Sequence, residues 1–188
     1  MHDGTVTLTP FTPLGSFRAF ATQEGHKRQM QICESAILQL ANHQINVSLH
    51  AMIYLTRRER FNAAHKLYRE GWTLEQNEAV FGKCSNPNWH GHNYELFVTV
   101  KGEVNPETGF VIDLKELKSI ITTYVIDKLD HRNVNLDVDF MQGKMASTEV
   151  LAIEIFHQLK AHIEAHGAIL HSVRLVETEN NSVEYFGD

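Results

Sequence analysis

An alternating run of apolar and polar residues at positions 93–101 constrains the fold of this chain more than any other feature. Every second position is apolar, at Tyr94, Leu96, Val98 and Val100. Successive side chains of a β-strand point to opposite faces of a sheet, so the run predicts a strand with one apolar face. A sheet built on this strand needs a cover for that face.

Further strands are predicted by runs of similar composition. They span positions 53–61, 171–178 and 182–186, and a short return strand at 110–112 follows a turn at 105–109 that contains Pro and Gly. Strands joined by tight turns pair in the antiparallel direction. These strands therefore predict an antiparallel sheet.

Two amphipathic helices are predicted after these first strands. Asp113 caps the first helix, with Glu116 as its capping-box partner. The second begins at 147–149 and ends at Gly167. Their predicted buried stripes are Leu114, Leu117, Ile121 and Tyr124 in the first helix, and Ala152, Ile155, Phe156, Leu159 and Ile163 in the second.

The order of these elements predicts an α+β fold, with a four-stranded antiparallel sheet and two helices on one face. Asn180 and Asn181 are expected to form the tight turn between the last two strands, because Asn tolerates positive φ. The second face of the sheet needs a partner. A homo-oligomer that closes its sheets into a barrel would bury it.

Residues 1–51 differ from the rest of the chain. They are poor in periodicity apart from a predicted amphipathic helix at 27–42, and they carry no recognisable chemistry. Met52 opens the regular segment. We therefore expect an N-terminal extension of unknown role at 1–51, followed by a single domain at 52–188.

Composition narrows the class of protein. The net charge of −6 argues against nucleic acid as a partner, because phosphate binding usually shows as a basic stripe. No apolar run is long enough to cross a bilayer, and the first residues do not resemble a secretory signal. The two cysteines, Cys33 and Cys84, do not make a disulfide framework. We expect a cytoplasmic protein that binds neither membrane nor nucleic acid.

The sequence His90-Gly91-His92 is the first signal of chemistry. Two histidines at i and i+2 of an extended chain point to one face, so both imidazoles can reach one ion. His65, at the end of a separate strand, can supply the third ligand. Three neutral histidines with an open fourth position are a catalytic zinc arrangement. The alternative is ordinary surface or core histidines, because the chain contains 12 of them.

Cys84 lies a few residues before this pair, in a segment rich in turn-forming residues. A nearby metal favours the thiolate, which acts as a base or a nucleophile. The alternative role of a buried, inert cysteine fits a Ser-, Asn- and Pro-containing loop poorly.

Two acidic positions complete the candidate site. Asp130 precedes His131, and an Asp beside a His can orient the ring and stabilise its charged form. A solvated helix end explains this dipeptide equally well. Glu177 shares a strand face with Val173 and Leu175, and a carboxylate on an apolar face needs a partner. An ion pair within or between chains is the alternative role for Glu177.

Residues 52–187 resemble the 6-pyruvoyl-tetrahydropterin synthases and the related 6-carboxytetrahydropterin synthases. Many short motifs stand in the order typical of that family, which makes the resemblance specific. They are Phe61-Asn62-Ala63-Ala64-His65, Phe81-Gly82-Lys83-Cys84, His90-Gly91-His92-Asn93-Tyr94, Leu129-Asp130-His131, Ser147-Thr148-Glu149 and Val176-Glu177-Thr178.

The resemblance implies the T-fold, assembled as a homohexamer of two trimers with barrels, and a pterin site at subunit interfaces. It also implies a role for each candidate residue. The ligands of Zn²⁺ would be His65, His90 and His92. The general base would be Cys84, and its partners would be Asp130 and His131 from this or a neighbouring subunit. Glu177 would bind the pterin ring, and Glu149 with Thr148 would line the pocket.

The resemblance implies one of two reactions on 7,8-dihydroneopterin triphosphate. One eliminates triphosphate and gives 6-pyruvoyl-tetrahydropterin. The other releases acetaldehyde and triphosphate and gives a 6-carboxy product for queuosine biosynthesis. The five residues between Cys84 and His90 favour the pyruvoyl reaction, which is our first prediction. A non-catalytic zinc-binding module of the same fold is the third alternative.

Overall fold

The computed structural model describes residues 27, 28, 31, 35 and 51–187. The chain divides into two units, Met1–Ile45 and Asn46–Asp188. Lys27, Arg28, Gln31 and Ser35 are helical, and the other positions of the helix predicted at 27–42 lie outside the described residues.

The larger unit is built on a five-stranded sheet in the order β3-β1-β2-β4-β5. Strands β1 and β2 pair antiparallel over their whole length, and so do their neighbours β2 with β4 and β4 with β5. The bounds are β1 Met52–His65, β2 His90–Glu103, β3 Arg132–Asn133, β4 Ile169–Thr178 and β5 Asn181–Tyr185.

The sheet has five strands, whereas four were predicted. The fifth strand, β3, has two residues and pairs parallel to β1. A strand of this length shows no alternation, so no sequence pattern marks it. The antiparallel arrangement of the four longer strands is confirmed.

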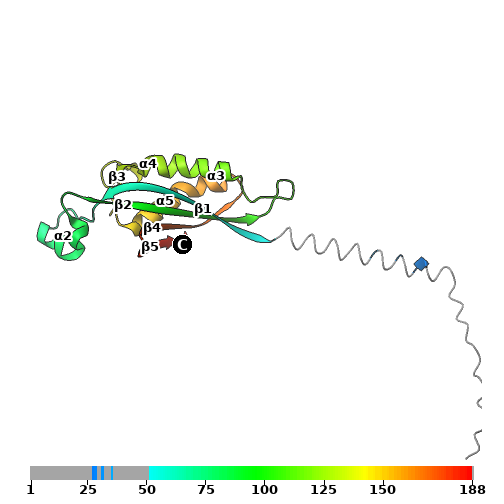
Figure 1. Cartoon of the computed structure of the whole chain (residues 1–188), viewed down its shortest axis with the longest axis horizontal. Coiled ribbons are helices and arrows are strands. Elements are labelled where there is room, and N and C mark those ends of the chain that lie inside the picture. Colours follow the sequence, from blue (N-terminus) through cyan, green and yellow to red (C-terminus); the bar gives the residue numbers. More distant parts are fainter. Residues whose placement is uncertain (1–26, 29–30, 32–34, 36–50, 188) are drawn as a thin grey trace, which may run out of the picture. The chain divides into compact units, whose positions relative to one another are not determined.

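Helices cover one side of this sheet, as predicted, and Figure 1 shows α3, α4 and α5 on that side. No helix among the described residues is long and apolar enough to cross a membrane. The bounds are α2 Leu74–Phe81, the 3-10 helix η1 Gly82–Ser85, α3 Leu114–Ile121, the π-helical segment η2 Thr122–Ile126, α4 Asp127–Leu129, the 3-10 helix η3 Asp139–Met141 and α5 Thr148–Glu164.

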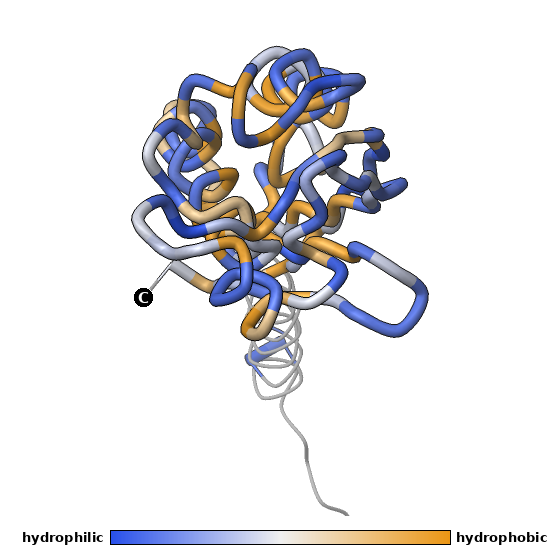
Figure 2. The backbone as a smooth tube through the Cα atoms, turned by 90° about the vertical axis from the view of Figure 1, so that its left-hand side faces the viewer, coloured by the Kyte–Doolittle hydropathy of each residue, from blue (hydrophilic) through white to orange (hydrophobic). Residues whose placement is uncertain are grey.

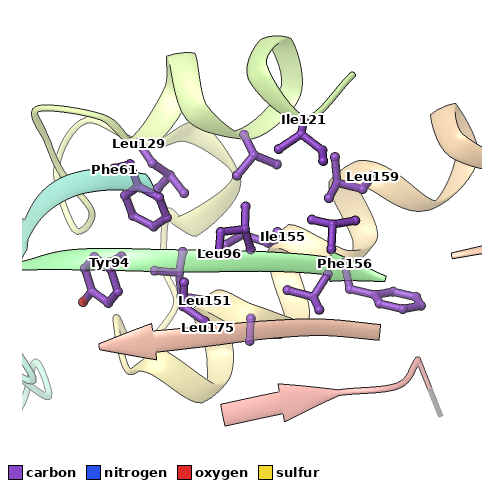
Figure 3. Packing of buried hydrophobic residues seen from close by; sticks show 14 of the residues in the cluster. Phe61, Tyr94, Leu96, Ile121, Leu129, Leu151, Ile155, Phe156, Leu159 and Leu175 are labelled. Carbon is purple, nitrogen blue, oxygen red and sulfur yellow. The ribbon is translucent and has the colours of Figure 1, made fainter. Parts of the chain in front are cut away.

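The core lies between the helices and the inner face of the sheet. Figure 3 shows Leu96 and Leu175 of the strands facing Ile155 and Leu159 of α5. Burying a side chain of this size contributes about 1.5–3 kcal/mol. Apolar segments gather in the middle of the domain, as the hydropathy colours of Figure 2 show. The alternating face predicted for β2 is confirmed, since Tyr94, Leu96, Val98 and Val100 are all buried.

The predicted stripe of α5 is confirmed in full, whereas that of the first helix is only half right. Leu117 and Ile121 are buried, but Leu114 is 49% exposed and Tyr124 36% exposed. The helix passes into η2, whose wider π turns shift the following positions around the axis. Val125 therefore enters the core in place of Tyr124.

Two local predictions were wrong. Positions 110–112 form bends instead of a return strand, and only Ile112 of the three is buried. In the hairpin between β4 and β5, Thr178 pairs with Asn181, so the turn residues are Glu179 and Asn180. Neither has positive φ, which among the described non-glycine residues occurs only at Trp89 and His131.

Candidate active site

Three histidines meet where β1 ends and β2 begins. His65 and His90 are register partners in the antiparallel ladder, and His92 lies opposite Ala63. One ring nitrogen from each of the three histidines lies within 4.8 Å of the other two. The pairing of β1 with β2 therefore assembles the triad that the sequence predicted.

The protonation of these rings suits metal binding. The Nδ1 atom of His65 lies 2.7 Å from the carbonyl oxygen of Ala146, which can only accept a hydrogen bond. Nδ1 therefore carries the proton and Nε2 keeps a free lone pair. Burial lowers the pKa of His65, His90 and His92, which favours the neutral, metal-binding form of each imidazole.

A further atom shows that the triad could hold a metal ion. The Nδ1 atom of His90 is buried and has no hydrogen-bond partner within the described chain. A buried polar atom without a partner costs about 1–3 kcal/mol. Coordination to a metal would remove this cost. The donor set of three imidazole nitrogens fits Zn²⁺ with an open fourth position.

Glu177, at the end of β4, stands directly against the triad. Its Oε1 atom lies 3.6 Å from Nε2 of His65 and 3.7 Å from Nε2 of His92. The same oxygen accepts a 2.6 Å hydrogen bond from the hydroxyl of Thr148, in the first turn of α5. Thr148 is therefore the hydrogen-bond partner that a carboxylate on the apolar face of β4 requires.

Tyr94 lies beneath the triad, with its hydroxyl 3.4 Å from Nε2 of His65. Burial, followed by the charge of Glu177, raises the pKa of Tyr94 above its ordinary range. The phenol is therefore neutral at physiological pH, and its ring stacks on Phe61 and contacts the edges of His65 and His92.

A cavity of about 400 Å³ opens beside the triad. Its lining includes five of the predicted site residues, namely His65, Cys84, Thr148, Glu149 and Glu177. The β4–β5 hairpin adds Asn180 and Asn181, which were predicted only as a turn, and Ser182, which was predicted only as the start of a strand. A cavity of this size and polarity fits a small heterocycle.

A short helical segment carries Cys84 to the cavity. Thr73 caps α2 and forms a capping box with Gln76, and the chain then turns through η1, which contains Cys84. The backbone N–H of Leu67 donates a 2.8 Å bond to the carbonyl oxygen of Cys84. Cys84 therefore lies in a short helix and not in the predicted loop, and α2 is a helix that was not predicted, although its Thr-x-x-Gln pattern is a recognisable helix start.

Asp130 and His131 form a second constellation. Asp130 accepts a 2.8 Å bond from the N–H of Asn62 through Oδ1 and contacts Nδ1 of His131 at 2.9 Å through Oδ2. The pKa of Asp130 lies below its ordinary range, mainly because of the hydrogen bond from the Asn62 N–H and to a smaller extent because of the hydrogen bond from His131. The N–H of His131 donates in turn to the Asn62 carbonyl, with the backbone of His131 at φ 58°.

This pair does not meet Cys84 within one chain. The side chain of His131 is 77% exposed and lines a separate cavity, which it shares with His92. Cys84 lines the cavity that holds Glu177. Within one chain the structure thus brings together the three histidines, Cys84 and Glu177, and leaves Asp130 and His131 on another side of the triad.

The family model for 6-pyruvoyl tetrahydropterin synthase matches residues 54–188. The 6-pyruvoyl tetrahydrobiopterin synthase of Dictyostelium discoideum is 43% identical over 136 residues, which cover 72% of this chain and 97% of the relative. The chain therefore belongs to the 6-pyruvoyl tetrahydropterin synthase family. The resemblance indicated by the sequence motifs is confirmed.

A solved structure supports the same assignment. The 6-pyruvoyl tetrahydropterin synthase of Caenorhabditis elegans superposes with a TM-score of 0.69 at 37% identity, covering 74% of this chain and 98% of that chain. The predicted α+β T-fold is thereby confirmed. A 6-carboxy-5,6,7,8-tetrahydropterin synthase from Haemophilus influenzae is more distant, at 30% identity over 124 residues and 55% of this chain.

Proposed function

We propose that this protein is a zinc-dependent synthase that converts 7,8-dihydroneopterin triphosphate into 6-pyruvoyl-5,6,7,8-tetrahydropterin and triphosphate. One observation carries the proposal. His65, one of three histidines that could hold a metal ion, lines the same cavity as the thiol of Cys84 and the carboxylate of Glu177. A metal centre, a base and a ring-binding group are the three parts that a proton-transfer reaction on a pterin side chain requires.

The triad and the thiol would act on the side chain of the substrate. His65, His90 and His92 would hold the ion. Lewis-acid polarisation of the side-chain hydroxyls is the chemistry that zinc supplies when bound. The Cys84 thiolate would remove a proton from a carbon that bears a hydroxyl, and would return it to the product.

The carboxylates would bind the ring. Glu177 would accept paired hydrogen bonds from the N–H donors of the aminopyrimidine, with Thr148 fixing the carboxylate in place. Glu149, next to Thr148 in the cavity wall, would bind the edge of the same ring. The ring is thereby oriented with its side chain toward the histidines.

Asp130 and His131 would complete the proton relay from a neighbouring subunit. The imidazole of His131 is exposed in the single chain, and its carboxylate partner keeps it oriented, so it is free to enter the site of another copy. A homohexamer built of two trimers is the assembly that we propose. Size-exclusion chromatography with light scattering measures this state.

The N-terminal extension at 1–51 would be an appended segment with no part in the reaction. We propose the cytoplasm as the place of action, because the Cys84 thiol, which forms no disulfide with any described residue, suits a reducing compartment. Fluorescence imaging of the tagged protein in its host cell tests that location.

The product identifies the reaction. We expect the zinc-loaded protein to release triphosphate from 7,8-dihydroneopterin triphosphate without acetaldehyde, with 6-pyruvoyl-tetrahydropterin identified by mass. Acetaldehyde in equal amount would instead establish the 6-carboxytetrahydropterin reaction of queuosine biosynthesis. If the zinc-loaded oligomer does not turn over the substrate, the remaining alternative is a non-catalytic zinc-binding module. The lower similarity to the 6-carboxy relative favours the first outcome.

A further inference from the structure

Tyr94 lies where the core of the domain ends and the candidate site begins. His90, His92 and Tyr94 occupy alternate positions of β2, so they share one face of that strand. Phe61 of β1 is the register partner of Tyr94, and the two rings stack with their centres 5.0 Å apart at one end of the core (Figure 3). Only 1% of Tyr94 is exposed. Its ring therefore belongs to the core, whereas its hydroxyl contacts His65 of the triad.

Hydrogen-bond acceptors gather around this hydroxyl. The Nδ1 proton of His65 is bound to the carbonyl oxygen of Ala146, so Nε2 of His65 can only accept a hydrogen bond. The Oε1 atom of Glu177 lies 3.6 Å from this nitrogen and 3.7 Å from Nε2 of His92. An ionised carboxylate also only accepts hydrogen bonds. Buried acceptors of this kind need a hydroxyl donor or a metal ion.

Two buried hydroxyls supply donors to these acceptors. Thr148 donates to Oε1 of Glu177 at 2.6 Å. The hydroxyl of Tyr94 lies 3.4 Å from Nε2 of His65, which is the acceptor that it reaches when no metal ion is bound. A separation of 3.4 Å is long for a hydrogen bond, so the bond is weak and its proton is easily redirected.

The phenol has a second possible acceptor in the pair formed by Thr148 and Glu177. Burial and the charge of Glu177 raise the pKa of Tyr94, and a hydrogen bond with Thr148 acts in the opposite direction. Both members of the pair are therefore close enough to interact with the phenol. A hydroxyl accepts one hydrogen bond while it donates another, so Thr148 can accept from Tyr94 and still donate to Glu177. These three side chains are called the Tyr94 network below.

We infer that Tyr94 is a positioning residue that couples metal binding at His65 to the orientation of Glu177. When Nε2 of His65 binds a metal ion, its lone pair is no longer available to the phenol. The phenol then donates to Thr148, because it is buried and water does not reach it. Thr148 thereby keeps the one orientation in which its own proton points at Glu177. The inference rests on the proposed function for the identity of the ligand at Glu177, a pterin ring.

The metal ion and the pterin ring should therefore strengthen each other's binding. A carboxylate that is already held in place loses less freedom when the ring binds, so metal binding raises the affinity for the ring. Thermodynamic linkage requires the ring to raise the affinity for the metal by the same factor. Coupling between two sites in proteins is typically about 5- to 150-fold, and a single hydrogen bond predicts a value near the lower end.

The affinity of the full-length protein for Zn²⁺ tests the inference, measured by competition with a chromophoric chelator, with and without saturating 7,8-dihydropterin. This probe has the N–H donors of the ring and lacks the hydroxylated side chain. We expect it to raise the zinc affinity of the wild type roughly fivefold or more. In Tyr94→Phe, which keeps the ring stacked on Phe61 and removes only the hydroxyl, the probe should leave the zinc affinity unchanged.

Two further variants separate the network from a general effect on stability. Tyr54→Phe is the matched control, because Tyr54 is 56% exposed, and it should retain the full coupling. Thr148→Val interrupts the Tyr94 network in the middle and should abolish the coupling as Tyr94→Phe does. At saturating zinc, the double variant should bind 7,8-dihydropterin no more weakly than Thr148→Val alone, because both changes remove the same network.

The outcomes separate this inference from the proposed function. Equal coupling in the wild type and in Tyr94→Phe, or no coupling in the wild type, would overturn the inference, and turnover of substrate by the same wild type would leave the proposed function intact. Coupling that depends on Tyr94 in a zinc-loaded wild type that never turns over would support the inference and overturn the proposed function. The protein would then be a pterin-binding protein controlled by its metal.

Discussion

The hydroxyl of Thr148 donates a 2.6 Å hydrogen bond to Oε1 of Glu177, and this bond joins the start of α5 to the end of β4. The same oxygen faces two imidazoles of the metal triad. One hydroxyl therefore fixes the carboxylate that we propose as the pterin-binding group.

Thr148→Val keeps the shape of this side chain and removes the bond. We expect the KM for the pterin substrate to rise about tenfold, because a hydrogen bond to a charged group contributes about 1.5–3 kcal/mol. The zinc content should not change. Thr123→Val, at an exposed position of η2, is the control, and an equal KM in both variants would contradict the role of Thr148.

His90→Ala should release the metal. Two remaining imidazoles hold zinc poorly, so the zinc content after dialysis should fall well below one ion per chain. His166→Ala, which changes an exposed histidine after α5, should keep its zinc. Full zinc occupancy in His90→Ala, measured by atomic emission, would rule out this ligand set.

Cys84→Ala should remove activity without disturbing the metal. Loss of a general base lowers kcat by about 10²–10⁴-fold, and the thiol is not needed as a ligand. The other cysteine of the chain offers a matched control, Cys33→Ala, which should retain full activity. Loss of zinc from Cys84→Ala would show that the sulfur binds the metal instead.

Asp130 should make the fold sensitive to acid. Its pKa in the folded protein lies below the ordinary value of 3.8, so the folded state binds fewer protons than the unfolded state. Its contribution to the free energy of unfolding is present above pH 3.8 and is lost as the pH falls through the lowered pKa. Urea titrations across this range should show a steeper loss for the wild type than for Asp130→Asn.

A chain that begins at Met52 should fold and turn over substrate at the wild-type rate. Strand β1 begins at this residue, and every candidate site residue follows it. Circular dichroism and the turnover assay measure the two properties. A truncated protein that folds but lacks activity would show that residues 1–51 take part in the reaction.

Residues with a strong local pattern could be predicted from the sequence. The alternation of β2 located its buried face, and the spacing of His90 and His92 predicted their shared direction. Position in the family motifs predicted that Cys84 and Glu177 belong to the site, and the two line one cavity.

Other features depend on contacts between distant segments. Strand β3 has two residues and owes its existence to pairing with Ala63 and Ala64 of β1. The π turn that moves Tyr124 outward leaves no mark in the apolar spacing. The distance between Cys84 and His131 depends on how the chain folds and assembles. The motif around each residue carries no information about that distance.

The pairing of His65 with His90 has a consequence for folding. Because the two ligands are direct register partners, a slip of β1 against β2 by one residue would turn one imidazole to the opposite face of the sheet. Mispaired chains would then lack a complete set of ligands. Metal availability during synthesis would thus select the correctly aligned hairpin, and zinc starvation would lower the yield of native protein as well as its activity.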